Sequence, residues 1–382
     1  METVKQEGLN EVLMNKLAAR IGRGEADAKG AIGRLIEEGK VSRDFIAYLG
    51  TGENGTSRIR YSRWDVDSPV LMDLPDDGDG KSFKLHDNAV GQIGEKFGIP
   101  TAYLRKLTRG QEWERNLAVK VMNEHSDHAR QNRSLVRVVG DEVRGVLSDS
   151  YRRLNAQIIL TSFIEAAYHA GAQLADGYMD DTRIYLEVLM PQPLIIPTTR
   201  NGDIAMAFGA RLSTSDYGDG ALDLRTFMLQ GICLNGMVRE SVMRQVHIGS
   251  VLPENILLSS ETYESDTRTS QLAIRDITQT LFSKDSLERR AWEIQKASAI
   301  EVSIQNELKS LNKNGLLLSD CKAVEEILIN HNLEDGIEGA NSLWLLVAGL
   351  TAHGRNVGDG GDKRRERDIQ EVAGNLLNRI KL

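Results

Sequence analysis

The hydrophobic pattern of this 382-residue chain changes its period twice, and this change limits the possible fold more than any other feature. In residues 1–40 apolar side chains recur every three or four positions, which is the period of a helix with one buried face. Between about residues 134 and 229 many of them alternate, as in strands, and after residue 260 the helical period returns. The sequence therefore predicts an α+β fold, with an antiparallel β-sheet core at 41–255 and helical extensions at 1–40 and 256–382.

Both helical regions carry apolar stripes. The N-terminal stripe predicts a pair of helices, the second of which ends at Gly39; its members are Leu9, Leu13, Leu17, Ile21, Ala28, Ile32, Leu35 and Ile36. A second stripe, from Leu287 to Leu311, predicts one long amphipathic helix whose apolar face is intramolecular core, with self-association as the alternative. The run 343–350 predicts a buried helix.

Strands are predicted where short apolar runs are bounded by turn residues. The clearest case is a β-hairpin of 135–139 and 143–147 around Gly140, followed by a helix that carries Ile158 and Phe163. The remaining predicted strands are 45–49, 57–61, 184–189, 204–212 and 222–229. An exposed acidic loop is expected at 73–80.

The net charge of −8 argues against a general polyanion binder, but charge can be concentrated locally. Residues 100–155 hold eleven basic and seven acidic side chains and form a basic island in an acidic chain. No apolar run is long enough to span a membrane and the N-terminus has no signal core, so a cytoplasmic location is expected. Cys233 and Cys321 are expected to be buried thiols.

Most motifs with a known chemistry fail on their context. The glycines at 50–55 match a dinucleotide fingerprint, but a strand-like segment follows where a helix is needed. Asp77 and Asp79 match the start of a calcium-binding loop, but Lys81 occupies the next ligand position and would repel the ion. His125 and His128 have the spacing of metal ligands but no third ligand nearby. We therefore expect no metal, no cofactor and no enzyme active site, although a scattered active site would leave no local signature.

Residues 90–107 have the spacing of a helix-turn-helix, with a small residue at Gly94 and a turn glycine at Gly98. Three basic side chains on the second helix, Arg105, Lys106 and Arg109, would face phosphates. The start of that helix lacks side chains suited to reading base edges, so a structural helical pair is expected. A duplex DNA reader is the alternative.

The stretch 136–155 contains "RGVLSD-x-Y", and residues 89–104 contain "GIP-x-x-YL" at the end of a helical pair. Together with "C-x-NG" at 233–236 and a helical pair around Trp344 to Leu377, these motifs resemble the phage/plasmid-like proteins known as domain of unknown function nine-three-two. The order of elements is also similar to the RecT-like and Rad-like single-strand annealing proteins of phages. The resemblance implies a mobile-element setting and an oligomeric protein that binds and anneals single-stranded DNA in recombination, without nucleotide hydrolysis.

Such a protein needs a basic groove that follows phosphates and leaves base edges free. Two arginines would lie on the hairpin strands, and three further residues would lie at the start of the next helix. The backbone N–H groups at a helix start are suited to bind a phosphate. The expected nucleic-acid-binding residues are Arg105, Lys106, Arg109, Arg137, Arg144, Tyr151, Arg152 and Arg153. As an alternative, Arg152 and Arg153 pair with Asp141 or Asp149 or stay solvated. Other functions left open are a module that binds a host defence protein and an unrecognised enzyme.

Overall fold

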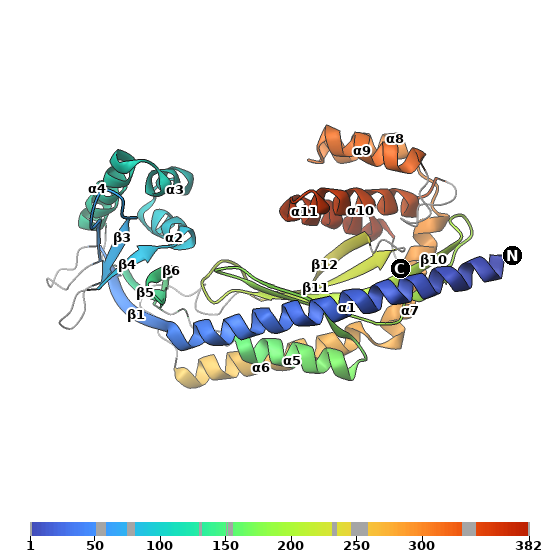
Figure 1. The fold of residues 1–382 in the computed structure, drawn as a ribbon, viewed down its shortest axis with the longest axis horizontal. Coiled ribbons are helices and arrows are strands. Elements are labelled where there is room, and N and C mark those ends of the chain that lie inside the picture. The colour runs from blue at the N-terminus through green and yellow to red at the C-terminus, as the bar shows by residue number, and fades with distance from the viewer. Residues whose placement is uncertain are drawn as a thin grey trace.

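The computed structural model shows an α+β molecule with two β-sheets, each with its own covering helices, joined by one long helix (Figure 1). The described residues are 2–50, 59–74, 81–129, 132–149, 151, 156–230, 235–245, 259–330 and 341–380. The predicted α+β class is therefore confirmed, but the predicted single core at 41–255 is divided between two sheets.

The first sheet has six strands in the order β1-β5-β6-β4-β3-β2. Their bounds are β1 Ser42–Leu49, β2 Arg60–Ser62, β3 Leu71–Leu74, β4 Lys81–Leu85, β5 Asn132–Val139 and β6 Glu142–Ser148. All neighbours are antiparallel except β4 and β6, which are parallel. The amide nitrogen of Ile59 donates to the carbonyl oxygen of Tyr48 at 3.1 Å, so the chain entering β2 returns to β1 and the sheet curls.

Three helices cover one face of this sheet: α2 Asp87–Phe97, α3 Thr101–Arg109 and α4 Glu112–His128. Gly98 ends α2 at φ 68°, a left-handed conformation that suits glycine. A Cβ atom at Gly94 would lie 3.0 Å from the carbonyl oxygen of Ile99, which explains the small residue where the chain turns towards α3. The predicted helical pair is confirmed, with His86 as the N-cap of α2, and α4 was not predicted.

The second sheet has the order β12-β11-β10-β8-β7, with β9 also paired to β10, and all of its pairs are antiparallel. The bounds are β7 Gln173–Met179, β8 Ile184–Leu189, β9 Leu194–Pro197, β10 Asp203–Thr214, β11 Leu222–Gln230 and β12 Asn235–Gln245. Alternating side chains such as Leu186 and Val188 share a core with α5 Ala156–His169 and α6 Ser260–Leu281. Their neighbours Glu187 and Leu189 point to the opposite face.

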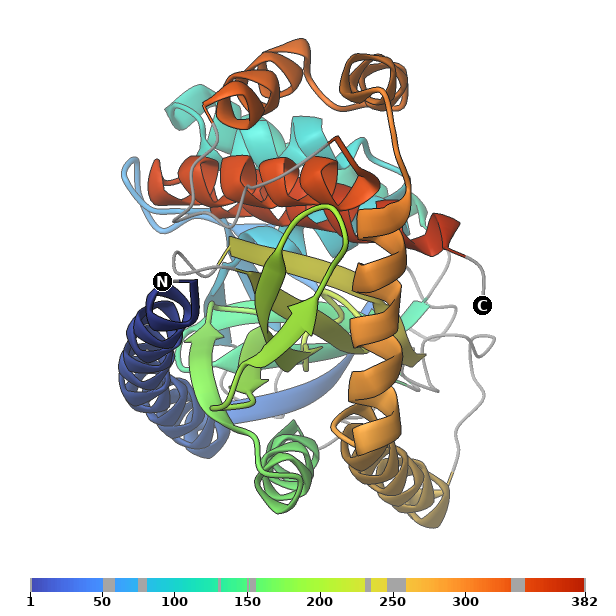
Figure 2. The same ribbon diagram turned by 90° about the vertical axis from the view of Figure 1, so that its right-hand side faces the viewer.

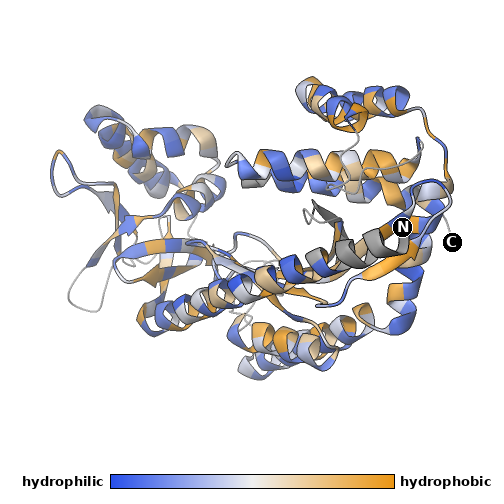
Figure 3. Ribbon diagram, turned by 45° about the vertical axis from the view of Figure 1, so that its right-hand side comes forward, coloured by the Kyte–Doolittle hydropathy of each residue, from blue (hydrophilic) through white to orange (hydrophobic). Residues whose placement is uncertain are grey.

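Helix α1 Glu2–Val41 runs along the second sheet and leads directly into β1 of the first (Figures 1 and 2). Hydrophobic and hydrophilic segments alternate along it, as expected for a helix with one buried face (Figure 3). A Cβ atom at Gly24 would overlap the carbonyl oxygen of Ala175 in β7, so the helix and strand backbones nearly touch. The predicted pair of helices is wrong: α1 is continuous and extends past Gly39.

The C-terminal region is helical, as predicted. Its elements are α7 Lys284–Ala299, α8 Ile304–Lys313, α9 Leu318–Ile329, α10 Leu343–Asp359, α11 Lys363–Leu376 and a 3₁₀ helix at Leu377–Arg379. The predicted single helix over 287–311 is instead two helices, because the carbonyl oxygen of Ile300 leaves the helix and accepts from the amide nitrogen of Leu343 at 2.9 Å.

Most of the stripe on α7 and α8 is buried, whereas Ile300 between the two helices is 39% exposed. Ile294 and Ala297 are fully buried and Leu308 and Leu311 nearly so, in one core with α10. The preferred interpretation of this stripe as intramolecular core is confirmed, and a self-association surface made of these side chains is excluded.

The predicted hairpin, the helix after it and the strands at 45–49, 184–189, 204–212 and 222–229 are confirmed. The strand predicted at 57–61 is β2, which begins at Arg60 and pairs with β3, not β1. Parts of several predictions lie outside the described residues, namely 51–58, 75–80, Cys233, Arg152 and Arg153. Cys321 is buried, as predicted. Within the described ranges no helix is long and apolar enough to cross a membrane.

Candidate nucleic-acid interface

Arg137 lies on β5 at the joint between the two sheets, and its guanidinium group is occupied internally. Its Nε and Nη2 atoms each donate to the carboxylate of Asp44 at 2.8 Å, and Nη1 donates to the carbonyl oxygen of Asp216 in the β10–β11 loop. The side chain is 1% exposed. Burial alone would lower the pKa of Arg137, but the Asp44 carboxylate outweighs it and raises the pKa above its ordinary value.

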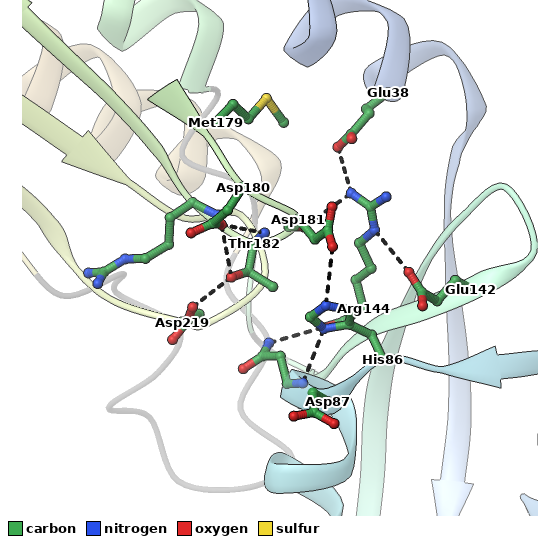
Figure 4. Close-up of polar contacts among 12 residues, drawn as sticks. Glu38, His86, Asp87, Glu142, Arg144, Met179, Asp180, Asp181, Thr182 and Asp219 are labelled. Atoms are coloured by element: carbon green, nitrogen blue, oxygen red, sulfur yellow. Dashed lines mark hydrogen bonds and ion pairs between the residues drawn. The ribbon is translucent and has the colours of Figure 1, made fainter. Parts of the chain in front are cut away.

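Arg144, on β6, is held in a second ionic cluster at the same joint (Figure 4). Its Nη1 atom donates to Glu38 at the end of α1 at 2.7 Å and to the carbonyl oxygen of Asp181 in the β7–β8 turn at 3.1 Å. The hydrogen bond from Arg34 of α1 lowers the pKa of the Asp181 carboxyl group, and the Nε2 atom of His86 lies 3.7 Å from that carboxylate. This cluster ties α1, β6, the β7–β8 turn and the start of α2 together.

Tyr151 is also internal. Its ring is 3% exposed, the Arg137 guanidinium lies 5.7 Å from the ring centre, and its hydroxyl group donates to the carbonyl oxygen of Ser215 at 3.2 Å. The structure thus brings Arg137, Arg144 and Tyr151 to one joint, where they bind protein groups. The alternative pairing of Arg152 and Arg153 with Asp141 or Asp149 lies outside the described residues.

The three basic residues of α3 point in different directions. Arg105 folds over Gly91 and its Nε atom donates to the carbonyl oxygen of Asp87 at 3.2 Å. Arg109 pairs with the Asp87 carboxylate through Nε at 2.7 Å, with its side chain 67% exposed. Lys106 is exposed. Only Lys106 and Arg109 therefore present charge outwards on this helix.

A groove of about 1200 Å³ lies between the end of α1, the first turn of α5 and the first half of α6. It continues along the α5–α6 crevice into smaller hollows of about 380 and 320 Å³, which share lining residues such as Gln157 and Gln271. We call this the α5–α6 groove. Its elongated form suits an extended polymer more than a compact small molecule.

The lining of the α5–α6 groove mixes apolar and polar side chains. Ile36, Ile158 and Leu272 are 38–41% exposed, so apolar surface is available in it. The cations Lys40, Arg268 and Arg275 line it, and Lys40 and Arg275 already pair with Glu37 and Asp276. The anions along the groove are Glu38, Asp44, Glu165, Asp216 and Glu264. Arg137 also lines the groove, but its charge is compensated by Asp44.

The cations of the groove were missed by the sequence analysis. Lys40 and Arg268 come from helices far apart in the sequence, so neither lies in a locally basic segment. The available signal was weak: Lys40 lies four positions after Ile36 and Arg268 four positions before Leu272, so each shares a helix face with one apolar residue. The predicted Arg152 and Arg153 lie outside the described residues, a few positions before Ala156, which lines the groove.

No family model, curated protein or solved structure matches this chain in the comparisons with known proteins.

Proposed function

We propose that the protein binds single-stranded DNA along the α5–α6 groove and promotes annealing of complementary strands without hydrolysing nucleotide. The observation that carries the proposal is the continuity of the groove, which extends from the end of α1 along the α5–α6 crevice. A single strand is an extended, flexible ligand that requires such a path.

The lining offers both kinds of contact that a single strand makes. Lys40, Arg268 and Arg275 supply charge for phosphates. The half-exposed apolar side chains Ile158 and Leu272 suit base faces. Because anions also line the groove, the number of phosphate contacts is small, and affinity depends on salt less steeply than for a strongly basic groove.

The test is fluorescence anisotropy with a labelled single strand and with a duplex of the same sequence, at about 50 and 200 mM salt. We expect tighter binding of the single strand. Reversing two charges with Lys40→Glu and Arg268→Glu should weaken that binding and flatten the slope of log affinity against log salt by about 1.4, from about 0.7 per lost contact.

The matched control reverses two exposed lysines of α8, Lys309→Glu and Lys313→Glu, which change net charge equally but lie away from the groove. The control variant should bind like the unmodified protein. Equal loss in both variants would show that only overall charge matters, and no loss in the groove variant would remove the groove as the site. Annealing of labelled complementary strands, monitored by energy transfer between their labels, tests whether the protein promotes annealing.

A further inference from the structure

Two of the four tryptophans of the chain lie on the surface of the first sheet's lobe. Trp64, in the loop between β2 and β3, is 66% exposed, and Trp113, in the first turn of α4, is 61% exposed. Val66, two residues after Trp64 in the same loop, is 56% exposed, and its carbonyl oxygen accepts from Arg115 of α4. We call these three side chains the indole patch. Large exposed apolar side chains gathered in this way mark interaction surfaces.

The indole patch is held in a fixed shape. The Ser68 hydroxyl group accepts a hydrogen bond from the amide nitrogen of Trp64 at 3.0 Å. The amide nitrogen of Ser68 in turn donates to Asp65 Oδ1 at 2.7 Å. Arg115 of α4 donates to the carbonyl oxygen of Val66 at 2.8 Å. Arg63 bonds the Asn116 side chain at 2.7 Å, one turn from Trp113. The loop is thus fastened to α4, and a ligand would find the indoles already positioned.

The charge around the indole patch is negative. Asp65, Asp67 and Glu112 are exposed and adjacent in sequence to the indoles. Within the described part of the chain, no ion pair engages the carboxylates of Asp67 or Glu112. The nearest cations, Arg63 and Arg115, use their guanidinium groups to hold the loop. This rim repels phosphates and attracts cations.

We propose that the indole patch binds a basic segment of a partner protein, with arginine or lysine side chains over the faces of Trp64 and Trp113. Indole rings attract guanidinium and ammonium groups through their faces. Asp67 and Glu112 pair with the neighbouring cations of the segment, so that charge and aromatic surface select the same ligand. The inference is independent of the α5–α6 groove, which lies beside the second sheet.

The experiment measures binding of a labelled arginine-rich peptide of about ten residues to the full chain by anisotropy. The double variant Trp64→Ala with Trp113→Ala should weaken binding by roughly tenfold. Asp67→Asn with Glu112→Gln keeps the indoles and should weaken binding severalfold, most visibly at low salt. Tyr178→Ala, which removes an exposed ring from β7, is the matched control and should bind like the unmodified protein.

Urea unfolding of each variant shows that the fold is retained, which is expected because the replaced side chains are exposed. The same variants are titrated with labelled single-stranded DNA, which should bind all of them equally. The proposal is overturned if the unmodified chain does not bind the peptide or if the indole variant binds it unchanged. It is also overturned if the indole variant loses DNA and not the peptide, which would make the patch a base-stacking surface.

Discussion

At Arg137 one guanidinium group connects three segments, since it binds Asp44 of β1 and the loop after β10 from its own strand β5. Removing one partner of a fully buried ion pair costs about 3–5 kcal/mol, but the Asp44 side chain is 39% exposed and water compensates part of its charge, so the cost here is about 1–3 kcal/mol. We therefore expect Arg137→Ala to lower the free energy of unfolding by about that amount, measured by urea denaturation. An Arg137→Ala protein with unchanged stability and weakened DNA binding would instead restore Arg137 as a DNA contact.

Asp176 on β7 gives a prediction with a defined pH dependence. Burial, and then the nearby charge of Glu187, raise the pKa of Asp176 above its ordinary value. Its charged form is therefore disfavoured in the folded state, and this penalty is present above the raised pKa. It disappears at low pH, where Asp176 is protonated both folded and unfolded.

We expect Asp176→Asn to raise the free energy of unfolding at about pH 7 and to leave it nearly unchanged at about pH 3. The Asn oxygen can keep the hydrogen bond that Asp176 accepts from Gly177. Urea denaturation of both proteins at the two pH values measures the difference. A variant less stable than the unmodified protein at neutral pH would contradict the expected sign.

Two glycines of α1 differ in what surrounds them. Gly24 packs against the backbone of Ala175, whereas nothing lies within 4 Å of a Cβ atom placed at Gly30. Gly24→Ala should push the helix from β7 and destabilise the protein by about 1–3 kcal/mol. Gly30→Ala should stabilise it by up to about 1 kcal/mol, because alanine favours the helix. Thermal unfolding of the two variants separates the effect of packing from that of helix propensity. Equal changes of the unfolding temperature in both variants would refute the close approach of Gly24 to the backbone of β7.

The α2–α3 pair allows a test of the duplex alternative. Arg105 is folded over Gly91, so it reaches outwards less than its position on α3 would suggest. Replacing Tyr103 and Arg105 with Ala should leave any sequence preference among duplexes unchanged. Random-site selection with both proteins measures this. A compact motif that is selected by the unmodified chain and lost in the variant would establish a duplex reader.

The period of the apolar side chains was sufficient to predict most helices and strands, because each period depends only on neighbouring residues. It predicted the hairpin of β5 and β6 but could not predict the pairing of strands that are distant in sequence. β1 pairs with β5, and β4 lies parallel to β6, so both pairings follow from packing between distant segments. The break between α7 and α8 was missed for the same reason, since Ile300 bonds to Leu343.

At the scale of the whole molecule, the candidate site was predicted only in part. A locally basic stretch indicates positive charge, but it does not reveal whether carboxylates far along the chain will pair with its basic side chains. Asp44 and Glu38 do so for Arg137 and Arg144, across separations of 93 and 106 residues. The cations of the α5–α6 groove come together only in the folded chain. The resemblance to the phage/plasmid-like family stays a prediction.

Annealing along an extended strand calls for several protomers, so we still expect self-association, through a surface other than the buried stripe on α7 and α8. Sedimentation velocity with and without single-stranded DNA measures it. The expected result is a species larger than 42.4 kDa in the presence of DNA. A monomer under both conditions would contradict assembly and would leave groove binding to be judged by the anisotropy experiment.

The long helix α1 has a consequence for the synthesis of the protein. The apolar side chains of its first half, such as Leu13 and Leu17, are buried against strands of the second sheet, and Arg20 pairs with Glu187, 167 residues later. At about 5–20 residues per second, a ribosome needs about 10–30 s to cover that distance. For that time the nascent helix has no partner strand, so we expect chaperones that bind apolar segments to occupy α1 until β7 and β8 emerge.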